Sequence, residues 1–284
     1  MPENVAGEFF VDQACIDCDT CRILAPLTFG WTDSGKSFVE RQPDSAAERH
    51  RALMALVSCP TAAIGTEHKL RVDAAVASLP ERIDGGVYYC GYASESSFGA
   101  SSYLIVRPSG NVMIDSPRAS KPLIKRVEAL GGVRLLFLTH RDDVADHERW
   151  VRAFGCERVM HKRDVSHETR NVERIVDGES PTRLDHDLVV IPVPGHTRGS
   201  AALLHDRYLF TGDHLWGTPD GSELSVSRTV CWYSWAAQTR SMSRLLDFDF
   251  EWVLPGHGFR YQAPSSTAMK AELQRVVERM RANR

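Results

Sequence analysis

Residues 138–147 read Leu-Thr-His-Arg-Asp-Asp-Val-Ala-Asp-His, and the rest of the chain can be interpreted outward from this stretch. It follows an apolar run of strand length, residues 134–138, and precedes residues 148–154, which have a helical pattern. Two imidazoles and three carboxylates on a strand-to-helix turn can converge on one point and suit a divalent transition metal. The alternative is an ordinary helix start, capped by Asp143 or Asp146, with its charges in water.

Three later turns carry the same chemistry at the end of an apolar run. In each of them a glycine directly precedes the polar residue, which is His196, Asp213 or His257. Glycine permits a tight turn and a close approach of the backbone, so the side chain is presented at the edge of a sheet. Four such turns in series favour a metal centre over unrelated loops.

With these motifs, residues 86–265 resemble the metallo-β-lactamase superfamily. Asn111–Asp115 also matches the strand-ending aspartate that this family uses to orient its metal loop. The resemblance implies an αββα sandwich with metals at one edge of its two sheets. The residue pattern alone predicts only an α/β or α+β chain.

The resemblance further implies two neighbouring metal sites. The residues of the second site would be Asp146, His147, Asp213 and His257. Asp213 would be the bridging carboxylate, and Asp146 would also orient the attacking water as the catalytic residue. The first site would keep His196, with His140 and Asp142 as candidate partners.

The metal loop departs from the family pattern His-x-His-x-Asp-His. His140 is followed by Asp142, and the Asp-His pair arrives two residues late, at Asp146 and His147. A carboxylate in place of an imidazole hardens the site and makes iron or manganese more competitive with zinc. The diiron flavoproteins of this superfamily also use a carboxylate in this loop, so the identity of the metal stays open.

A second constellation consists of Cys15, Cys18, Cys21 and the remote Cys59, which precedes Pro60. This is the ligand run of a bacterial-type ferredoxin. Zinc is the alternative, although zinc knuckles usually present two separate Cys-x2-Cys pairs, and disulfides are disfavoured in a cytosolic protein. The run resembles a single-cluster [4Fe–4S] ferredoxin in which Cys59 closes its own cluster.

The two constellations predict two domains. Residues 1–66 would form a small α+β ferredoxin-like domain with a hairpin over 29–39 and a helix over 46–57, residues 67–85 a linker and hinge, and residues 86–284 the metallo-β-lactamase-like domain. The elements expected in the larger domain are a hairpin over 103–114, helices over 122–130, 146–154 and 266–280, and strands over 134–138, 188–193, 201–204 and 208–210.

Composition restricts the partners. The chain has 284 residues, of which 43% are hydrophobic and 25% charged, as in ordinary globular proteins that bury a full core. A net charge of -3 gives no electrostatic case for nucleic acid or an anionic membrane. The N-terminus has no signal-peptide pattern, and no apolar run approaches the roughly 18 residues of a membrane-spanning helix. We therefore expect a cytoplasmic protein.

Three functions remain open from the sequence. The first is a metal-dependent hydrolase of a small-molecule substrate, with the ferredoxin domain structural or regulatory. The second is a non-haem iron oxidoreductase that receives electrons from the [4Fe–4S] cluster, with a redox protein as a further partner. The third is a non-enzymatic iron or redox sensor. Two aromatic segments, residues 215–221 and residues 229–235, would form a pocket wall or belong to the core; Trp232 and Tyr233 lie in the second segment.

Overall fold

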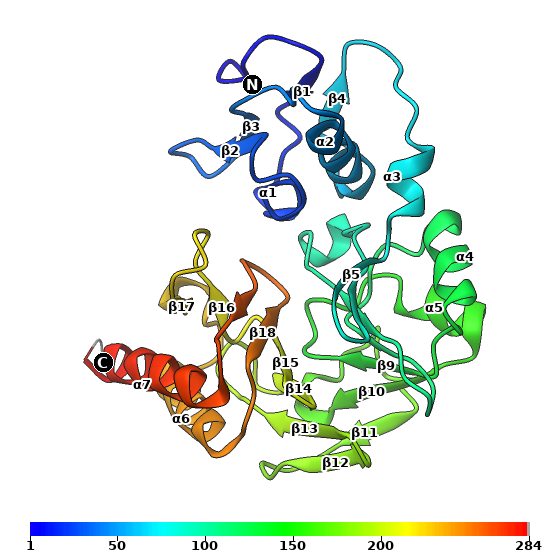
Figure 1. Ribbon diagram of the computed structural model, residues 1–284. Helices are drawn as coiled ribbons and strands as arrows, with labels where there is room; N and C mark the ends of the chain where they lie inside the picture. The colour runs from blue at the N-terminus through cyan, green and yellow to red at the C-terminus, as the bar shows by residue number, and fades with distance from the viewer. Residues whose placement is uncertain (283–284) are drawn as a thin grey trace. The chain divides into compact units, whose positions relative to one another are not determined.

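The computed structural model describes residues 1–282 (Figure 1). The chain divides into two compact units. The first unit comprises Met1–Leu135 and Ala145–Cys156, and the second comprises Leu136–Val144 and the chain from Glu157 onward. The stretch 138–147 is therefore divided between the two units.

The N-terminal part of the first unit is small and mixed. Its helices are α1 (Thr20–Leu24) and α2 (Ala46–Ser58), and its strands pair as β1 (Phe9–Val11) with β4 (Ile64–Thr66) and β2 (Phe29–Trp31) with β3 (Ser37–Val39), both antiparallel. Ser45 caps α2 by accepting a hydrogen bond from the backbone N–H of Glu48, while the Glu48 carboxylate accepts one from the N–H of Asp44. The predicted hairpin over 29–39 and the helix that leads to Cys59 are both confirmed.

The stretch expected to be a linker and hinge, residues 67–85, contains regular secondary structure. It contains α3 (Asp73–Ala77) and β5 (Glu81–Asp84), and β5 pairs antiparallel with β6 (Val87–Tyr89). The sheet continues in the order β5-β6-β7-β8 through β7 (Tyr103–Ile105) and β8 (Val112–Ile114). Every residue of β7 and β8 is buried, as expected for a sheet interior. Two helices, α4 (Lys121–Ala129) and α5 (His147–Phe154), complete the unit, together with the short 3-10 turn η1 (Glu95–Ser97).

The second unit holds the strands that present the polar turns. β9 (Leu135–Leu138) begins at the boundary and is followed in the sheet order by β10 (Glu157–His161) and β11 (Arg174–Val176). A six-stranded sheet has the order β12-β13-β14-β15-β18-β19. Its strands are β12 (Thr182–Asp185), β13 (Leu188–Pro192), β14 (Ala201–His205), β15 (Tyr208–Gly212), β18 (Trp252–Pro255) and β19 (Tyr261–Gln262).

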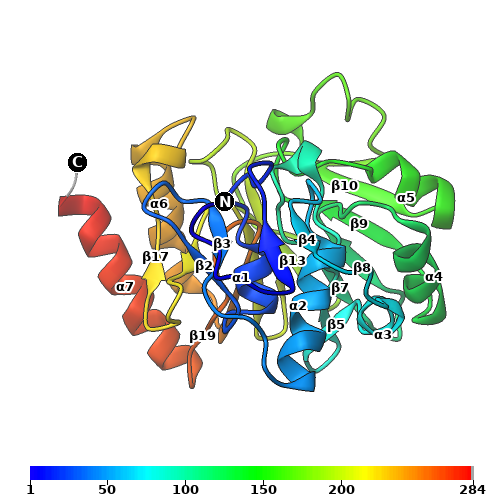
Figure 2. The ribbon, with the colours of Figure 1, turned by 90° about the horizontal axis from the view of Figure 1, so that it is seen from above.

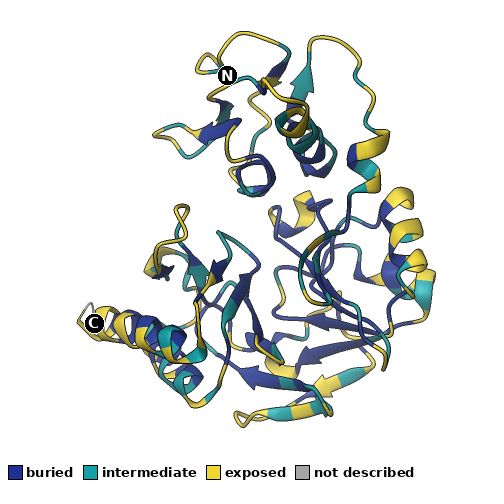
Figure 3. Ribbon diagram, viewed as in Figure 1, coloured by how far each residue is buried: buried dark blue, intermediate teal, exposed yellow. Residues whose placement is uncertain are grey.

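Helices cover this six-stranded sheet. α6 (Trp235–Arg244) and α7 (Ser266–Ala282) lie side by side in both views (Figures 1 and 2). Met242 of α6 and Leu273 of α7 belong to the same fully buried core as Ile191, Leu209 and Val253 of the strands. The opposite side of α7 is exposed (Figure 3). The smaller elements are β16 (Trp216–Gly217), β17 (Leu224–Ser225) and the 3-10 turns η2 (Lys162–Asp164), η3 (Arg228–Val230) and η4 (Leu245–Asp247).

The elements expected from hydrophobic periodicity in the larger domain are confirmed, with ends that shift by one or two residues. Among residues 1–282, none of the helices combines the length and the apolar composition that crossing a bilayer requires.

Candidate functional site

Four turns of the second unit bring their side chains to one place. His140 follows β9, His196 lies in the loop between β13 and β14, Asp213 follows β15 and His257 follows β18. β15 and β18 are parallel and end in register at Gly212 and Pro255, so the residues after them emerge together. The N–H of Ala201 donates to the carbonyl of Thr139 at 2.8 Å, which holds the end of β9 against the start of β14. Strand pairing thus explains the convergence.

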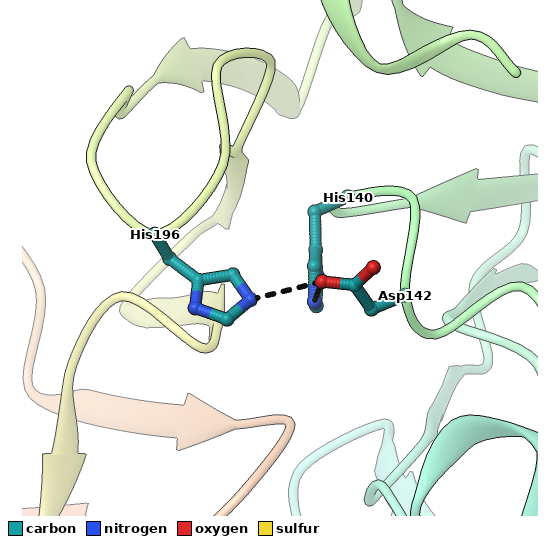
Figure 4. Close-up of side chains that lie close together, drawn as sticks. All are labelled: His140, Asp142 and His196. Carbon is teal, nitrogen blue, oxygen red and sulfur yellow. Dashed lines mark hydrogen bonds and ion pairs between the residues drawn. The ribbon is translucent and has the colours of Figure 1, made fainter. Parts of the chain in front are cut away.

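The first ligand group is His140, Asp142 and His196, whose ligand atoms all lie within 4.8 Å of one another. Figure 4 shows these three side chains directed toward a common point. His196 Nε2 lies 3.2 Å from Asp142 Oδ2, and His140 Nε2 lies 3.8 Å from the same oxygen. The sequence predicted this set as the first metal site, and the structure brings its three members together.

Hydrogen bonds on the far side of each ring fix which nitrogen faces the group. Nδ1 of His140 is bonded to the Thr139 hydroxyl at 3.0 Å, and Nδ1 of His196 donates to the carbonyl of Val230. In both residues Nε2 is therefore the nitrogen directed at the carboxylates. This is the usual orientation of a metal-binding histidine, whose second nitrogen is held by an outer partner.

The second ligand group is His140, Asp143 and Asp213. His257 adjoins it, with Nε2 at 3.8 Å from Asp143 Oδ1 and 3.9 Å from Asp213 Oδ2. Asp213 Oδ2 also lies 3.6 Å from Nε2 of both His140 and His196. This oxygen is next to all three imidazoles, which is the position that a bridging carboxylate requires.

The buried atoms of these groups fit a cation. Among the described residues, His140 Nε2, both carboxylate oxygens of Asp143 and Asp213 Oδ1 are buried and have no hydrogen-bond partner. Buried polar atoms in folded proteins are normally paired, because an unpaired one costs free energy. Imidazole nitrogens and carboxylate oxygens are ligands of first-row divalent metals. The residues present therefore fit one or two divalent ions.

Neighbouring imidazoles favour the ionised form of two carboxylates in the site. The hydrogen bond from His196 lowers the pKa of Asp142. Burial opposes ionisation of Asp213, but the neighbouring imidazoles outweigh it, His257 and His140 first, and its pKa is lowered. Burial lowers the pKa of His214 to about 3, so this ring is neutral at pH 7. The carboxylates are therefore ready to bind a cation.

Two glycines permit the close packing of the site. A Cβ on Gly256 would lie 2.7 Å from Asp213 Oδ1 and 2.8 Å from Asp143 Oδ2. Gly212 has a φ of +51°, and a Cβ there would lie 2.5 Å from the hydroxyl oxygen of Thr139. A larger residue at either position would displace a ligand-bearing turn, which agrees with the role expected for glycine before the metal-binding residues.

Asp164, at the end of η2, ties two of the turns together. It is 1% exposed, and its carboxylate accepts hydrogen bonds from the Thr197 hydroxyl, from the N–H of Gly199 at 2.6 Å and from the N–H of Arg141 at 3.2 Å. It therefore holds the His196 turn and the His140 turn in one arrangement. Nothing in the sequence Lys162–Asp164 marks Asp164 as a support of distant turns, so it could not be identified from the sequence.

The aromatic stretch after η3 is fastened to the His196 turn. The N–H of Tyr233 lies 3.2 Å from the carbonyl of Gly195 and 3.0 Å from that of His196. The indole of Trp232 lies 6.0 Å from the His196 ring between centroids, and the residue is 63% exposed. Trp232 and Tyr233 are thus exposed beside the first ligand group, and their role as a pocket wall stays a prediction.

Asp146 and His147 lie in the first unit, where Asp146 precedes α5 and His147 begins it. The Asp146 carboxylate accepts hydrogen bonds from the N–H of Ala119 at 2.7 Å and from Arg149 at 3.1 Å. Within residues 1–282, neither residue belongs to the ligand groups described above. Their assignment to the metal, and that of Asp146 to catalysis, stay predictions. Asp143, one of the three carboxylates of the turn and a candidate helix cap from the sequence, was not assigned to either metal site there but belongs to the second ligand group.

The four predicted cluster cysteines lie around one cavity of the first unit. Cys15, Cys18, Cys21 and Cys59 all line it, and all four are free thiols. The N–H of Ser37 donates to Cys15 Sγ at 3.3 Å, and Cys18 and Cys21 lie beside the hydroxyls of Thr20 and Ser37. Burial raises the pKa of Cys18 to about 11 and that of Cys21 to about 12. Thiolates in this cavity therefore need a compensating cation, and the four sulfurs fit an iron–sulfur cluster.

Comparison with known families identifies both regions. Residues 11–66 match the family described as the 4Fe-4S single cluster domain of Ferredoxin I, and residues 97–257 match the metallo-beta-lactamase superfamily. The second match covers more than half of the chain. The expected fused architecture and the expected mixed α/β fold class are both confirmed.

Individual relatives are more distant. A hydroxyacylglutathione hydrolase from Xanthomonas oryzae pv. oryzae is 34% identical over 120 residues, which are 40% of this chain and 45% of that protein, so the match spans less than half of this relative. Among solved structures, ETHE1 from Myxococcus xanthus is 20% identical, with 67% of this chain and 84% of that chain covered and a TM-score of 0.49. A metallo-beta-lactamase superfamily protein from Sulfolobus tokodaii is 16% identical, with 68% and 86% covered and a TM-score of 0.46.

Proposed function

The chain belongs to the metallo-beta-lactamase superfamily, and we propose that it is a metal-dependent hydrolase of a small-molecule substrate. One observation carries the proposal: three imidazoles and two further carboxylates surround Asp213, and several buried atoms of these six residues have no hydrogen-bond partner among the described residues. The similarity to a hydroxyacylglutathione hydrolase supports hydrolysis as the class of reaction. A cytoplasmic location is part of the proposal.

The six residues divide into two sets. Divalent ions at such sites act as Lewis acids and supply a nucleophile from water at neutral pH. One ion would be held by His140, Asp142 and His196, and the other by Asp143, Asp213 and His257. Asp213 adjoins all three imidazoles, so it would be the carboxylate shared by the two sets.

Two of the ligand side chains are buried and two are partly exposed, so the site is closed on one side and open on the other. The side chains of His140 and Asp143 are 2% and 1% exposed, whereas those of Asp142 and His257 are 32% and 31% exposed. His140 and Asp143 therefore fix the geometry away from water. Asp142 and His257 face the side from which a substrate enters. A fixed arrangement of this kind avoids reorganisation during the reaction.

The rim of the site suggests what it binds. Trp232 and Tyr233 are exposed aromatic residues beside His196, and the guanidinium of the exposed Arg198 lies 5.7 Å from the Tyr233 ring. Exposed aromatic residues beside polar ligand groups favour contact with an apolar part of a ligand, and arginine favours an anion. We propose that the substrate is an ester or thioester that carries both an apolar group and a negative charge.

A second candidate function has its own support. The site offers as many carboxylates as imidazoles, which makes iron more competitive with zinc than a histidine-rich site would. A 4Fe-4S domain in the same chain could deliver electrons to such an iron. The alternative is therefore a non-haem iron oxidoreductase, which would need an external electron donor such as a redox protein.

Metal and sulfide analysis of the anaerobically purified protein separates the two functions. A hydrolase predicts iron equal to acid-labile sulfide at about four each, with one or two zinc ions per chain. An oxidoreductase predicts iron in excess of sulfide by about one or two, with little zinc. Asp213→Ala should remove the extra zinc or iron and leave the sulfide unchanged. Activity that survives Asp213→Ala would refute both functions.

A further inference from the structure

A glycine far outside the ferredoxin match contacts a cysteine of the cluster cavity. Gly99 has a φ of +81°, and a Cβ on it would lie 2.2 Å from Cys18 Cβ and 2.9 Å from Cys18 Sγ. The same Cβ would lie 3.4 Å from Pro60, which follows Cys59. No side chain fits there without displacing Cys18. The backbone at Gly99 therefore forms a wall directly against one of the four sulfur ligands.

Two further contacts join the same parts of the first unit. The N–H of Ala93 donates to the carbonyl of Ser58 at 3.1 Å, directly before Cys59. The guanidinium of Arg118 donates to the carbonyl of Val57 at 3.0 Å and lies over the Tyr92 ring, 5.8 Å from its centroid. The end of α2, from which Cys59 departs, is thus held from two directions.

The segment that carries Gly99 is itself held in place. The N–H of Gly99 donates to the carbonyl of Ser94 at 2.8 Å, which closes the turn around η1. The hydroxyl of Ser97 accepts a hydrogen bond from the N–H of Ala145 at 3.1 Å, and Ser97 is 2% exposed. Because Ala145 directly precedes Asp146, this segment also contacts the start of α5. The wall against Cys18 is a fixed surface.

We propose that residues 91–99 and Arg118, which lie outside the ferredoxin match over residues 11–66, form part of the iron–sulfur site. Solvent access and the packing around the sulfur ligands set both the stability and the reduction potential of such clusters. Gly99 is the position that lets the chain beyond the ferredoxin match reach Cys18. Residues 91–99 and Arg118 therefore control how well the cluster is retained and how readily it is reduced, whether the chain is a hydrolase or an oxidoreductase.

The test compares two glycine variants of the full-length, anaerobically reconstituted protein. Gly99→Ala places a methyl group on Cys18. Gly155→Ala has a similar backbone, with a φ of +64°, but its methyl group would meet no atom within 4 Å, so it controls for backbone strain. The measurements are acid-labile sulfide per chain and the midpoint potential of the cluster, followed by its electron paramagnetic resonance signal.

We expect Gly99→Ala to lose sulfide, or to retain a cluster with a shifted midpoint potential, while Gly155→Ala matches the unmodified protein. Sulfide content and potential that are the same in the two variants would overturn the proposal.

A second pair of variants tests the proposal if Gly99→Ala does not fold. Arg118→Gln removes the hydrogen bond to Val57, and Arg126→Gln removes an exposed arginine of α4 that has no place in this contact. The measurement is the rate at which the visible absorption of the cluster is lost in the presence of an iron chelator. We expect a several-fold faster loss in Arg118→Gln than in Arg126→Gln. Equal rates would then overturn the proposal.

Discussion

The sequence and the structure assign different aspartates to the second ligand group, Asp146 and Asp143 respectively. Family resemblance selects Asp146, because it precedes a histidine, whereas the structure places Asp143 within the second ligand group. Asp146 instead accepts hydrogen bonds from Ala119 and Arg149. In a run of polar residues between a strand and a helix, the backbone dihedrals decide which carboxylate turns inward. Asp146 has a φ of +56°, and no residue pattern announces this.

The two aspartates therefore make a direct test. Asp143→Asn removes a charged, buried oxygen ligand, so we expect the affinity of the protein for the second ion to fall by more than about 10-fold. This effect is at least as large as that of losing a residue that hydrogen-bonds to a metal ligand. Asp146→Asn keeps an oxygen that can accept the hydrogen bond from Ala119, so we expect a smaller loss. Metal titration of the apoprotein with zinc measures both. A larger loss in Asp146→Asn would restore the assignment made from the family.

Asp164 holds two of the ligand-bearing turns without belonging to either ligand group, and its substitution tests this positioning role. Asp164→Asn replaces one acceptor oxygen with a donor, so it cannot accept all the hydrogen bonds from Thr197, Gly199 and Arg141. We expect metal affinity to fall by about 10- to 100-fold, as for other outer partners of metal ligands. Asp177→Asn, at an exposed ion pair with Lys162, is the control and should change little. Equal affinities in the two variants would show that Asp164 does not position the turns.

At the scale of elements, an ion pair fastens the strand β10 to the start of β11. Arg158 is buried and donates to both carboxylate oxygens of Glu173. The hydrogen bonds from Arg158 lower the pKa of Glu173 from 4.5 to about 2. A carboxylate whose pKa is lower in the folded protein stabilises it above the unfolded pKa, and this contribution is lost as the pH falls toward the folded value.

We therefore expect Glu173→Gln to lower the free energy of unfolding at pH 7. The difference from the unmodified protein should persist down to about pH 4.5 and shrink as the pH approaches 2. Chemical denaturation at several pH values measures it, with the exposed Glu168→Gln as control. A difference that stays constant over this pH range would show that the ion pair is not its source.

Most elements were predictable because their periodicity is clear. The buried runs of β9, β13 and β15 stand out as apolar stretches bounded by polar residues, glycine or proline, and Ser45 with Glu48 marks the start of α2. β5 was missed because Glu81–Asp84 is largely polar, and Gly85-Gly86 was interpreted as a hinge. The same two glycines between two short runs are also the signature of a tight hairpin, which is what the structure contains.

At the scale of the whole molecule, the fused architecture could be predicted from cysteine spacing and from the four polar turns, because both patterns reflect fixed coordination geometry. The contact of Gly99 with Cys18 could not, because a single glycine in a loop carries no sign of a partner 81 residues away in sequence. The metal and the reaction are equally hidden, since they depend on the whole donor set and on what enters the open side.

Cys18→Ser tests how the two halves of the molecule work together. Serine is a poor ligand for an iron–sulfur cluster, so we expect the visible absorption near about 400 nm to bleach and the sulfide per chain to fall. The two ligand groups around Asp213 lie in the other unit, so the zinc or iron that they bind should remain.

If the protein is a hydrolase, turnover of an ester or thioester should then survive, apart from a loss of stability that the midpoint of thermal unfolding would show. If it is an oxidoreductase, turnover with reductant should be lost while the extra iron is retained. An unchanged absorption spectrum would refute the cluster itself, and reductant-dependent turnover without the cluster would show that it is not the electron donor.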